Sequence, residues 1–195
     1  MNDARASRDA AHFDRLYQRS QDPWQFRSSP YEREKYNATI AALPARRFRA
    51  ALEIGCSIGE LTRLIAGRAD GVHGVDISAA ALARAEERCA DLPQVRFTQM
   101  TVPAQWPLGL HDLIVLSEVL YFLTADDIGK LAERVCQSIT AGGIVLLVNF
   151  LGETGDPTSG DDAADIFIAA TAGALQVDLQ VRHEKYRLDR LFRPH

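Results

Sequence analysis

The chain has 195 residues, of which 47% are hydrophobic and 25% are charged, a composition typical of one globular domain with a buried core. Its formal net charge of −4 and its pI near 5.7 argue against a nucleic-acid partner. The longest apolar run, Ile144–Val148, is too short to span a bilayer, and no signal peptide opens the chain, so we expect no membrane partner and a cytoplasmic location.

The first 44 residues predict a helical arm. Asp9–Arg19 and Tyr31–Leu43 have helical patterns of apolar residues, and Pro44 ends the second helix. The arm carries more large aromatic side chains than a solvated tail needs: Trp24, Phe26, Tyr31 and Tyr36. We therefore expect residues 1–44 to form a lid over a ligand-binding domain of residues 45–195. The alternative is that the aromatic side chains only add a layer to the core.

A glycine-rich turn follows the first predicted strand, Ala50–Ile54. Gly55 and Gly59 flank the turn, and a helix comes next. Glycines allow a ligand to approach the backbone closely, and a helix N-terminus presents unpaired N–H groups. The second strand, Gly71–Val75, leads directly into Asp76, an acid about 20 residues past the turn, which is the spacing that holds the ribose hydroxyls of a nucleotide. These residues predict a site for an adenosine-containing cofactor.

The same turn formally fits two other motifs. Gly55-Cys-Ser-Ile-Gly59 has the G-x-S-x-G form of the α/β-hydrolase nucleophile elbow, but it follows the first strand and no HGGG-type oxyanion loop precedes it. The G-x-G-x-x-G fingerprint of nicotinamide and flavin sites fails because the turn has only two glycines. Cys56 and Ser57 have no base visible in the sequence, so we expect them to contribute backbone N–H groups rather than nucleophiles. The three cysteines are too far apart for a disulfide framework or a metal site.

The remaining elements alternate between strands and helices. Strands are predicted at Val95–Gln99, Leu113–Leu116 and Ile144–Phe150, with a final antiparallel pair at Val177–Tyr186 and Leu188–Phe192. Helices are predicted from the cap Ser78 to Ala90, over Asp126–Thr140 with Gly142-Gly143 as its stop, and over Asp162–Ala174. This alternation predicts an α/β fold with a single-domain, doubly wound, mostly parallel sheet and a C-terminal antiparallel hairpin.

Polar residues gather where the predicted strands end, which is where such sheets bind ligands. Met100 and Thr101 follow the third strand, where an adenine ring can stack. Ser117, Glu118 and Tyr121 follow the fourth strand. Because these residues come from scattered positions in the chain, their expected convergence at one edge of the sheet strengthens the prediction of a cofactor site.

Several segments resemble known proteins. The pattern Glu53-x-Gly55-x-x-x-Gly59 looks like motif I of the class I S-adenosylmethionine-dependent methyltransferases. Further segments resemble the nodulation S family of N-methyltransferases: Phe13-Asp-Arg-Leu-Tyr17, Asp22-Pro-Trp-Gln-Phe26, Tyr31-Glu-Arg-Glu-Lys-Tyr36 and Leu116-Ser-Glu-Val-Leu-Tyr121. The resemblance implies a Rossmann-like methyltransferase fold, S-adenosylmethionine as cofactor and S-adenosylhomocysteine as product. That family methylates the amine of a chito-oligosaccharide, but many relatives with this pattern have unassigned acceptors, so the resemblance identifies the cofactor rather than the substrate.

The implied cofactor has a set of expected contacts. Glu53 would accept hydrogen bonds near the methionine amino group, and Asp76 would accept those of the ribose hydroxyls; alternatively, Glu53 caps the turn and Asp76 caps the next helix. One basic residue of the arm, which we take to be Arg33 rather than Arg27 or Lys35, would pair with the cofactor carboxylate. The complete predicted cofactor site is Glu53, Gly55, Cys56, Ser57, Gly59, Asp76, Ile77, Met100, Thr101, Ser117, Arg33 and Trp24.

The predicted catalytic residues are Glu118, Tyr121 and His12 of the arm. An amine must lose a proton before its lone pair can attack, and Glu118 can bind the ammonium and take that proton, or else only orient the cofactor. The acidic stretch Glu153–Asp165 contains no basic residue and would favour a cationic acceptor. We therefore expect a small-molecule amine as acceptor, bound by a monomer or a homodimer.

Two positions depart from the family pattern. Met100 stands where a small residue or glycine is expected, and Asn149 ends the fifth strand where a histidine is expected. If that histidine is the base in relatives, its replacement leaves the base open, with Glu118 and His12 as candidates. Two alternatives to an N-methyltransferase remain. One is an O- or carboxyl-methyltransferase, which would need a positive acceptor pocket, and the other is a catalytically silent protein that binds S-adenosylmethionine.

Overall fold

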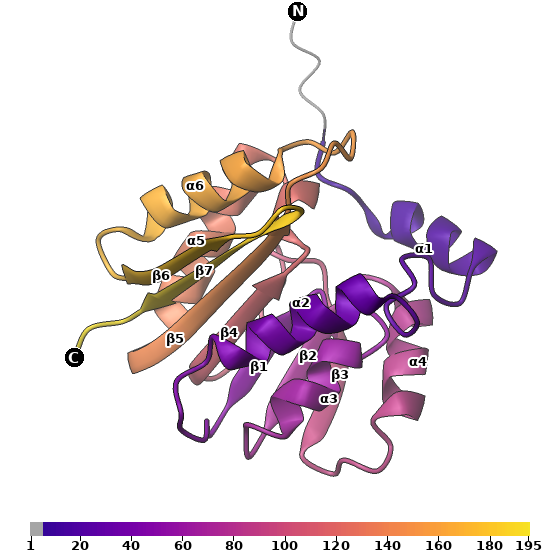
Figure 1. Cartoon of the computed structure of the whole chain (residues 1–195), viewed down its shortest axis with the longest axis horizontal. Coiled ribbons are helices and arrows are strands. Elements are labelled where there is room, and N and C mark those ends of the chain that lie inside the picture. The colour runs from indigo at the N-terminus through magenta and orange to yellow at the C-terminus, as the bar shows by residue number, and fades with distance from the viewer. Residues whose placement is uncertain (1–5) are drawn as a thin grey trace, which may run out of the picture. The chain divides into compact units, whose positions relative to one another are not determined.

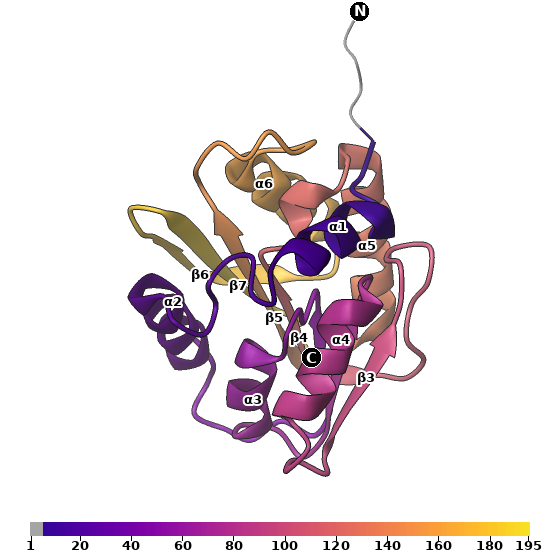
Figure 2. The same cartoon turned by 90° about the vertical axis from the view of Figure 1, so that its right-hand side faces the viewer.

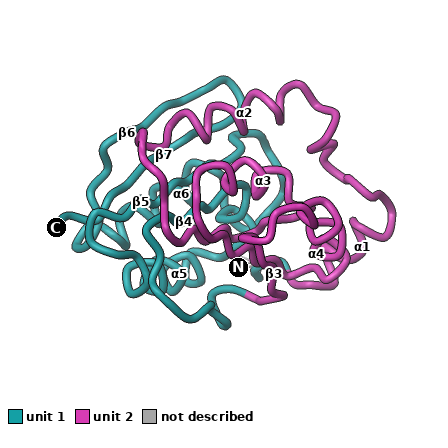
Figure 3. The backbone as a smooth tube through the Cα atoms, turned by 90° about the horizontal axis from the view of Figure 1, so that it is seen from below, with its two compact units in different colours: residues 1–8, 102–195 teal, residues 9–101 magenta. Residues whose placement is uncertain are grey.

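The computed structural model describes residues 6–195 (Figure 1), which form two compact units (Figure 3). We call residues 9–101 the N-terminal unit, and residues 6–8 together with 102–195 the C-terminal unit. Residues 9–44 of the expected arm fall in the same unit as the first three strands. The division into an arm of residues 1–44 and a ligand-binding domain of residues 45–195 stays a prediction.

The N-terminal unit is built on three parallel strands in the order β3-β2-β1. They are β1 (Ala51–Ile54), β2 (Val72–Asp76) and β3 (Val95–Gln99), connected by the helices α3 (Glu60–Ala66) and α4 (Ala79–Arg88). Every residue of β1 and β2 is buried, as in parallel strands that are covered on both faces. The glycine turn follows β1 and Asp76 ends β2, so both lie at the carboxyl ends of neighbouring strands.

Two capped helices precede these strands. α1 (Ala10–Arg19) begins after Asp9, whose side chain caps its first turn, and α2 (Pro30–Ala41) begins after the cap Ser29 with a proline as its first residue. α1 packs against α4 (Figure 2). The contact buries Tyr17, which is 3% exposed, so α1 joins the core of the N-terminal unit.

The C-terminal unit contains four strands in the order β4-β5-β7-β6. They are β4 (His111–Ser117), β5 (Ile139–Phe150), β6 (Gln176–Arg182) and β7 (Tyr186–Phe192). β4 and β5 are parallel, whereas β7 is antiparallel to both β5 and β6 (Figure 1). The 3₁₀ helix η1 (Leu120–Phe122) and the helices α5 (Ala125–Ser138) and α6 (Gly160–Thr171) complete the unit. The predicted parallel strands and C-terminal hairpin are therefore present.

The first described residues form hydrogen bonds within the C-terminal unit. The Ser7 hydroxyl donates to Oδ2 of Asp127 at 2.6 Å, and the Arg8 guanidinium donates to Oδ1 of Asp156 at 2.8 Å. The next residue, Asp9, already belongs to the N-terminal unit. The chain therefore crosses from one unit to the other immediately before α1.

The Gly142-Gly143 pair lies within β5, whereas the sequence predicted that it ends the preceding helix. The helix α5 stops at Ser138, and β5 starts at once with Ile139. Gly142 has a φ of 68°, and its N–H donates to the carbonyl of Arg193 at 2.8 Å. The two glycines therefore lie near the start of β5, where the chain contacts Arg193 close to the C-terminus. This contact between distant segments cannot be predicted from the local sequence.

Other boundaries also differ from the prediction by a few residues. The final hairpin turns at residues 183–185, closed by a hydrogen bond from the His183 N–H to the carbonyl of Tyr186 at 2.9 Å, so β6 ends earlier and β7 begins earlier than expected. α6 begins at Gly160, because Ser159 accepts a hydrogen bond from the N–H of Asp162 and caps the helix.

Candidate functional site

Three residues of the turn between β1 and α3 have left-handed backbone. Gly55, Ser57 and Gly59 have φ values of 75°, 49° and 81°. The glycines adopt this conformation without steric cost, whereas Ser57 needs support from its surroundings. The Ser57 N–H donates to Oδ2 of Asp76 at 2.8 Å, and the Ser57 and Tyr17 hydroxyls are hydrogen-bonded to each other. The turn is therefore tied both to the end of β2 and to α1.

The N–H groups at the start of this turn are bonded within the protein. Those of Gly55 and Cys56 donate to the carbonyl of Val75 at 2.8 and 3.0 Å. The Ser57 N–H likewise donates within the protein, to Asp76. The neighbouring strand β2 supplies the acceptors. The expected contribution of the Cys56 and Ser57 N–H groups to a cofactor site stays a prediction.

Asp76 connects the turn to α4. Its Oδ2 accepts the Ser57 N–H, and its Oδ1 accepts the Ser78 N–H at 2.9 Å. Burial raises the pKa of this carboxyl group, and the hydrogen bonds from Ser78 and Ser57 oppose the rise. Since each carboxylate oxygen can accept more than one hydrogen bond, the geometry allows both expected roles, the cap and the holder of ribose hydroxyls.

Glu53 lies in β1, just before the turn, and is buried, with 2% of the residue exposed. The Thr62 hydroxyl of α3 donates to its Oε2 at 2.5 Å. Burial raises the pKa of Glu53 to about 8, although the Thr62 bond opposes the rise, and the charge of Asp76 adds to it. Glu53 thus links β1 to α3, which is the structural role that the sequence left as its alternative.

We expect the ligand-free protein to lose stability as the pH rises from about 5 to about 8. A folded Glu53 with a pKa of about 8 holds its proton more tightly than the unfolded chain, where the ordinary value is 4.5. This contribution is complete below the unfolded pKa and is lost as the pH rises through the folded one. Asp76 acts in the same direction, because its pKa is also raised.

Urea unfolding at several pH values checks this expectation. The free energy of unfolding should fall with pH in the wild type and in the exposed control Glu87→Gln, but Glu53→Gln should flatten the slope. An unchanged slope in Glu53→Gln would contradict it.

The residues expected beside the adenine ring lie after β2 and β3. The Met100 N–H donates to the carbonyl of Asp76 at 2.9 Å, and the Gln99 side chain donates to the carbonyl of Ile77 at 3.0 Å. Ile77 and Met100 are half-buried, and Thr101 is exposed. These bonds hold the two strand ends together, so the structure places all three expected residues along one edge with Asp76.

α1 contacts both loops of this candidate cofactor site. Oδ1 of Asp14 accepts a hydrogen bond from the Ser78 hydroxyl at 2.9 Å. Tyr17 packs against Ile58 of the turn and Ala81 of α4. The sequence did not predict the hydrogen bond between the Tyr17 and Ser57 hydroxyls. Its only signal was a polar atom on an otherwise apolar helix face.

The other arm residues that we assigned to the site differ in their surroundings. Trp24 is 36% exposed and stacks on Phe26 with ring centroids 5.5 Å apart. Arg33 is exposed on α2, and His12 is half-buried with its ring edge-to-face against Phe13. The proposed roles of Trp24, Arg33 and His12 stay predictions.

Lys35 is the basic side chain of the arm that the structure buries. It is 2% exposed, and its Nζ lies 2.9 Å from Oε2 of Glu32 and 5.2 Å from the centroid of the Tyr31 ring. Its charge is thus already balanced inside the protein. Arg27 lies 3.8 Å from Glu60. Both observations favour Arg33, among the three candidates, as the partner of a cofactor carboxylate.

We expect amides of residues 9–36 to exchange hydrogen more slowly when S-adenosylhomocysteine is bound. The bonds of α1 to the turn and to the cap of α4 mean that a ligand which orders the turn also orders α1. Hydrogen exchange followed by mass spectrometry checks this, with α5 as an internal control that should not change. Equal protection of the arm in both states would show a fixed core layer and contradict the lid.

Glu118 follows β4 with a left-handed φ of 58°. Its N–H donates to the carbonyl of Val148 at 2.8 Å, and its Oε2 accepts the Tyr121 hydroxyl at 2.7 Å and the Phe150 N–H at 3.1 Å. Ser117, the last residue of β4, is 9% exposed. The structure therefore brings Glu118 and Tyr121 into direct contact. A non-glycine residue held at positive φ with a fixed carboxylate points to a functional role.

Asn149 ends β5, where the sequence pattern led us to expect a histidine. The residue is 0% exposed, and within residues 6–195 neither atom of its side-chain amide has a hydrogen-bonding partner. A carboxamide does not take up a proton near neutral pH, so Asn149 is not the base. Glu118 and His12 stay the predicted candidates.

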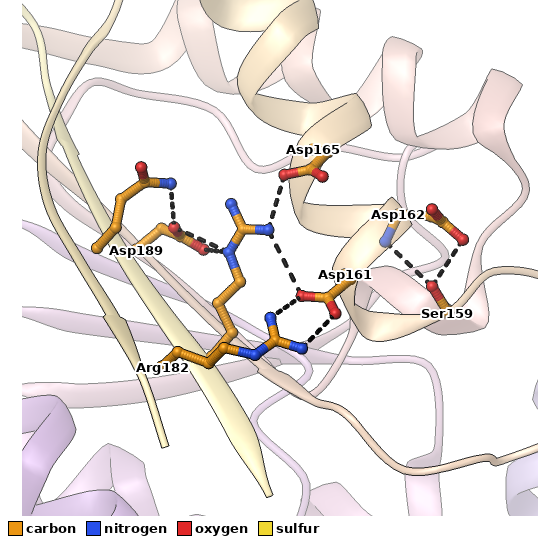
Figure 4. A network of polar contacts seen from close by, with 8 residues as sticks. Ser159, Asp161, Asp162, Asp165, Arg182 and Asp189 are labelled. Carbon is orange, nitrogen blue, oxygen red and sulfur yellow. Dashed lines mark hydrogen bonds and ion pairs between the residues drawn. The ribbon is translucent and has the colours of Figure 1, made fainter. Parts of the chain in front are cut away.

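Part of the negative charge of the acidic stretch is balanced within the protein, and the cationic acceptor that this stretch led us to expect stays a prediction. Asp161 and Asp165 lie on α6 and bind guanidinium groups of the β6–β7 hairpin (Figure 4). Arg182 donates to both oxygens of Asp161 at 2.7 Å, and Arg187 donates to Asp165 at 2.7 Å. The balancing cations come from residues far along the chain, which is why the local sequence overstated the negative charge.

The Cys56 side chain is buried in the glycine turn. Burial raises the pKa of the Cys56 thiol well above its ordinary value, which disfavours the nucleophilic thiolate. No group of three or more His, Cys, Asp or Glu side chains within residues 6–195 is placed to hold a metal ion. No helix in that range is long and apolar enough to cross a membrane.

Comparison with known proteins gives the family. The family model of Nodulation protein S (NodS) matches residues 10–142. The chain belongs to the nodulation protein S family. Nodulation protein S of Sinorhizobium fredii is 29% identical over 117 residues, which are 60% of this chain and 53% of that protein. A trans-aconitate 2-methyltransferase of Deinococcus radiodurans is 32% identical over 141 residues, which are 71% of this chain and 50% of that enzyme.

A solved structure of this family has the same fold. The crystal structure of the N-methyltransferase NodS from Bradyrhizobium japonicum, in complex with S-adenosylhomocysteine, matches with a TM-score of 0.83 at 22% identity, covering 95% of this chain and 98% of that one. This member of the nodulation protein S family therefore has the Rossmann-like fold of class I methyltransferases, as the sequence predicted. The chain spans about half the length of the named relatives that it matches in sequence.

Proposed function

We propose that this member of the nodulation protein S family is an S-adenosylmethionine-dependent methyltransferase that acts on the amine nitrogen of a small molecule. The observation that carries the proposal is the Glu118 carboxylate, held by Tyr121 and Phe150 at the end of β4. The family context supports it, since the NodS protein of Bradyrhizobium japonicum is an N-methyltransferase solved with S-adenosylhomocysteine.

The N-terminal unit has the features that the cofactor needs. When bound, S-adenosylmethionine supplies an electrophilic methyl group. Asp76 retains acceptor capacity for the ribose hydroxyls, and the left-handed turn at Gly55 and Gly59 lets the cofactor approach the backbone. Ile77 and Met100 would contact the adenine. Glu53 stabilises the turn by accepting a hydrogen bond from the Thr62 hydroxyl of α3.

Glu118 prepares the acceptor in this proposal. At neutral pH most molecules of an amine are protonated on nitrogen. The nitrogen lone pair can attack only after that proton has left. The Glu118 carboxylate binds the ammonium form and takes the proton, directly or through water. The Tyr121 hydroxyl and the Phe150 N–H keep the carboxylate oriented for this step. Because Asp161 and Asp165 of α6 are paired with arginines, we expect this local contact, rather than long-range attraction, to select a cationic acceptor.

A carboxylate acceptor is the second candidate, favoured by one observation. Trans-aconitate 2-methyltransferases from Rhizobium etli and Deinococcus radiodurans are each 32% identical over the matched segments. A carboxylate acceptor would be repelled by Glu118 and would need a positive pocket.

A panel of matched acceptors tests the proposal. The purified protein is incubated with methyl-labelled S-adenosylmethionine and with glucosamine oligomers that have a free amine, their fully N-acetylated counterparts, or trans-aconitate. We expect label only in the free amines. Label in trans-aconitate would favour the second candidate, and binding of S-adenosylhomocysteine without transfer to any acceptor would favour a silent binding protein.

A further inference from the structure

The first turn of α6 approaches the end of β5 more closely than any side chain would allow. A methyl group added at Gly160 would lie 1.9 Å from the carbonyl oxygen of Phe150 and 2.9 Å from its carbonyl carbon. Both atoms belong to the backbone, so they cannot swing aside as a side chain could. Only glycine permits this approach, because it has no Cβ.

Phe150 contacts Glu118 through its other backbone group. Its N–H donates to Oε2 of Glu118 at 3.1 Å, the oxygen that also accepts the Tyr121 hydroxyl. A displacement of Phe150 would therefore move a donor that orients the Glu118 carboxylate. Gly160 and Glu118 are linked through a single residue of β5.

The N-terminal half of α6 is bound to the β6–β7 hairpin. Arg182 and Arg187 of the hairpin bind Asp161 and Asp165, and Asp189, which is 0% exposed, pairs with Arg187 at 2.8 Å (Figure 4). These partners leave the first turn of α6 little freedom to move away from β5.

The segment just before α6 is bound to η1. The Thr158 hydroxyl donates to the carbonyl of Leu123 at 2.7 Å, and the Thr158 N–H donates to the carbonyl of Tyr121 at 3.3 Å. The start of α6 and the segment before it therefore contact Phe150 and Tyr121, each of which donates a hydrogen bond to the Glu118 carboxylate.

We propose that Gly160 is a positioning residue for Glu118: by allowing α6 to lie against Phe150, it sets the orientation of the carboxylate that receives the acceptor proton. The proposal rests on the proposed function of Glu118. It concerns the acceptor step, because the atoms nearest to a methyl group at Gly160 belong to Phe150 and Asn149.

The test compares alanine substitutions at two glycines of the C-terminal unit. Gly160→Ala should lower kcat for an amine acceptor about tenfold or more, since a shift of about 1 Å can cost up to 10²-fold, while the Kd of S-adenosylhomocysteine stays within about twofold of the wild type. Gly129→Ala is the matched control, because a methyl group there meets no atom within 4 Å, and its kcat should equal that of the wild type. A wild-type kcat in Gly160→Ala would overturn the proposal.

A double-mutant cycle separates positioning of Glu118 from general damage. In the Glu118→Gln background, Gly160→Ala should lower kcat by less than about twofold, because the group that it positions is already gone. Losses that simply multiply would overturn the proposal.

Two further measurements keep the proposal testable when activity or folding is lost. The backbone amide proton of Phe150 should change its NMR chemical shift in both Gly160→Ala and Glu118→Gln, and this readout needs no acceptor, so it stands even if the proposed function fails. If Gly160→Ala does not fold, Asp161→Asn loosens the same turn without adding atoms, because it weakens the contact with Arg182. That variant should lower kcat with unchanged cofactor affinity, and an unchanged kcat would overturn the proposal.

Discussion

Replacing Glu118 by glutamine is expected to lower kcat for methyl transfer to an amine by about 10²–10³-fold, the range that a general base contributes. The Kd of S-adenosylhomocysteine should stay within about twofold, because glutamine keeps the shape of the side chain and can still accept the hydrogen bonds of Tyr121 and Phe150. A loss in kcat without a loss in cofactor affinity is the signature of a group that acts on the acceptor in the transition state.

Steady-state kinetics and calorimetry of two glutamine variants check this result. Glu133→Gln, at an exposed position of α5 in the same unit, should behave as the wild type. Tyr121→Phe should fall between the two, because it removes one of the two donors to the carboxylate. Normal turnover in Glu118→Gln would move the role of base elsewhere, first to His12.

Asp76→Ala should weaken binding of S-adenosylhomocysteine by about 10–150-fold, corresponding to about 1.5–3 kcal/mol for hydrogen bonds to a charged acceptor. The variant removes the acceptor of the Ser57 N–H, which supports the turn, and the acceptor of the Ser78 N–H at the start of α4. It would also remove the proposed acceptor of the ribose hydroxyls. Isothermal titration calorimetry measures the loss, with the exposed Glu86→Ala on α4 as the control.

A cofactor analogue distinguishes the two roles of Asp76. If Asp76 holds the ribose, S-adenosylhomocysteine that lacks the 2′-hydroxyl should bind more weakly than the parent compound to the wild type, but equally well to Asp76→Ala. If Asp76 only shapes the turn, the analogue should lose the same factor with both proteins. An unchanged Kd for the parent compound in Asp76→Ala would exclude both roles.

Local patterns in the sequence predicted the central elements of the candidate cofactor site. The strand, glycine turn and helix around Gly55, and the acid Asp76 after the next strand, are short-range signals whose physics is local. Glu118 and Tyr121 were both predicted to follow the fourth strand, three positions apart in the sequence. The contact between their side chains is the part of the acceptor site that the structure adds.

Partners that are distant in the chain could not be predicted. The arginines that balance Asp161 and Asp165 lie about 20 residues later, on a hairpin whose pairing decides where they point. The Tyr17 hydroxyl was assigned to an apolar helix face, and its contact with Ser57 depends on the packing of α1 on α4. Gly160 carried no local signal, because the need for a missing Cβ arises only where α6 meets Phe150.

The attachment of Ser7 and Arg8 has a consequence for the order of events during synthesis. Their partners Asp127 and Asp156 lie 120 and 148 residues later in the chain. At about 5–20 residues per second, a ribosome needs roughly 6–30 s to make the intervening stretch. The three parallel strands of the N-terminal unit can pair during that interval, whereas Ser7 and Arg8 must wait. Ser7 and Arg8 are thus among the last residues to form their native contacts.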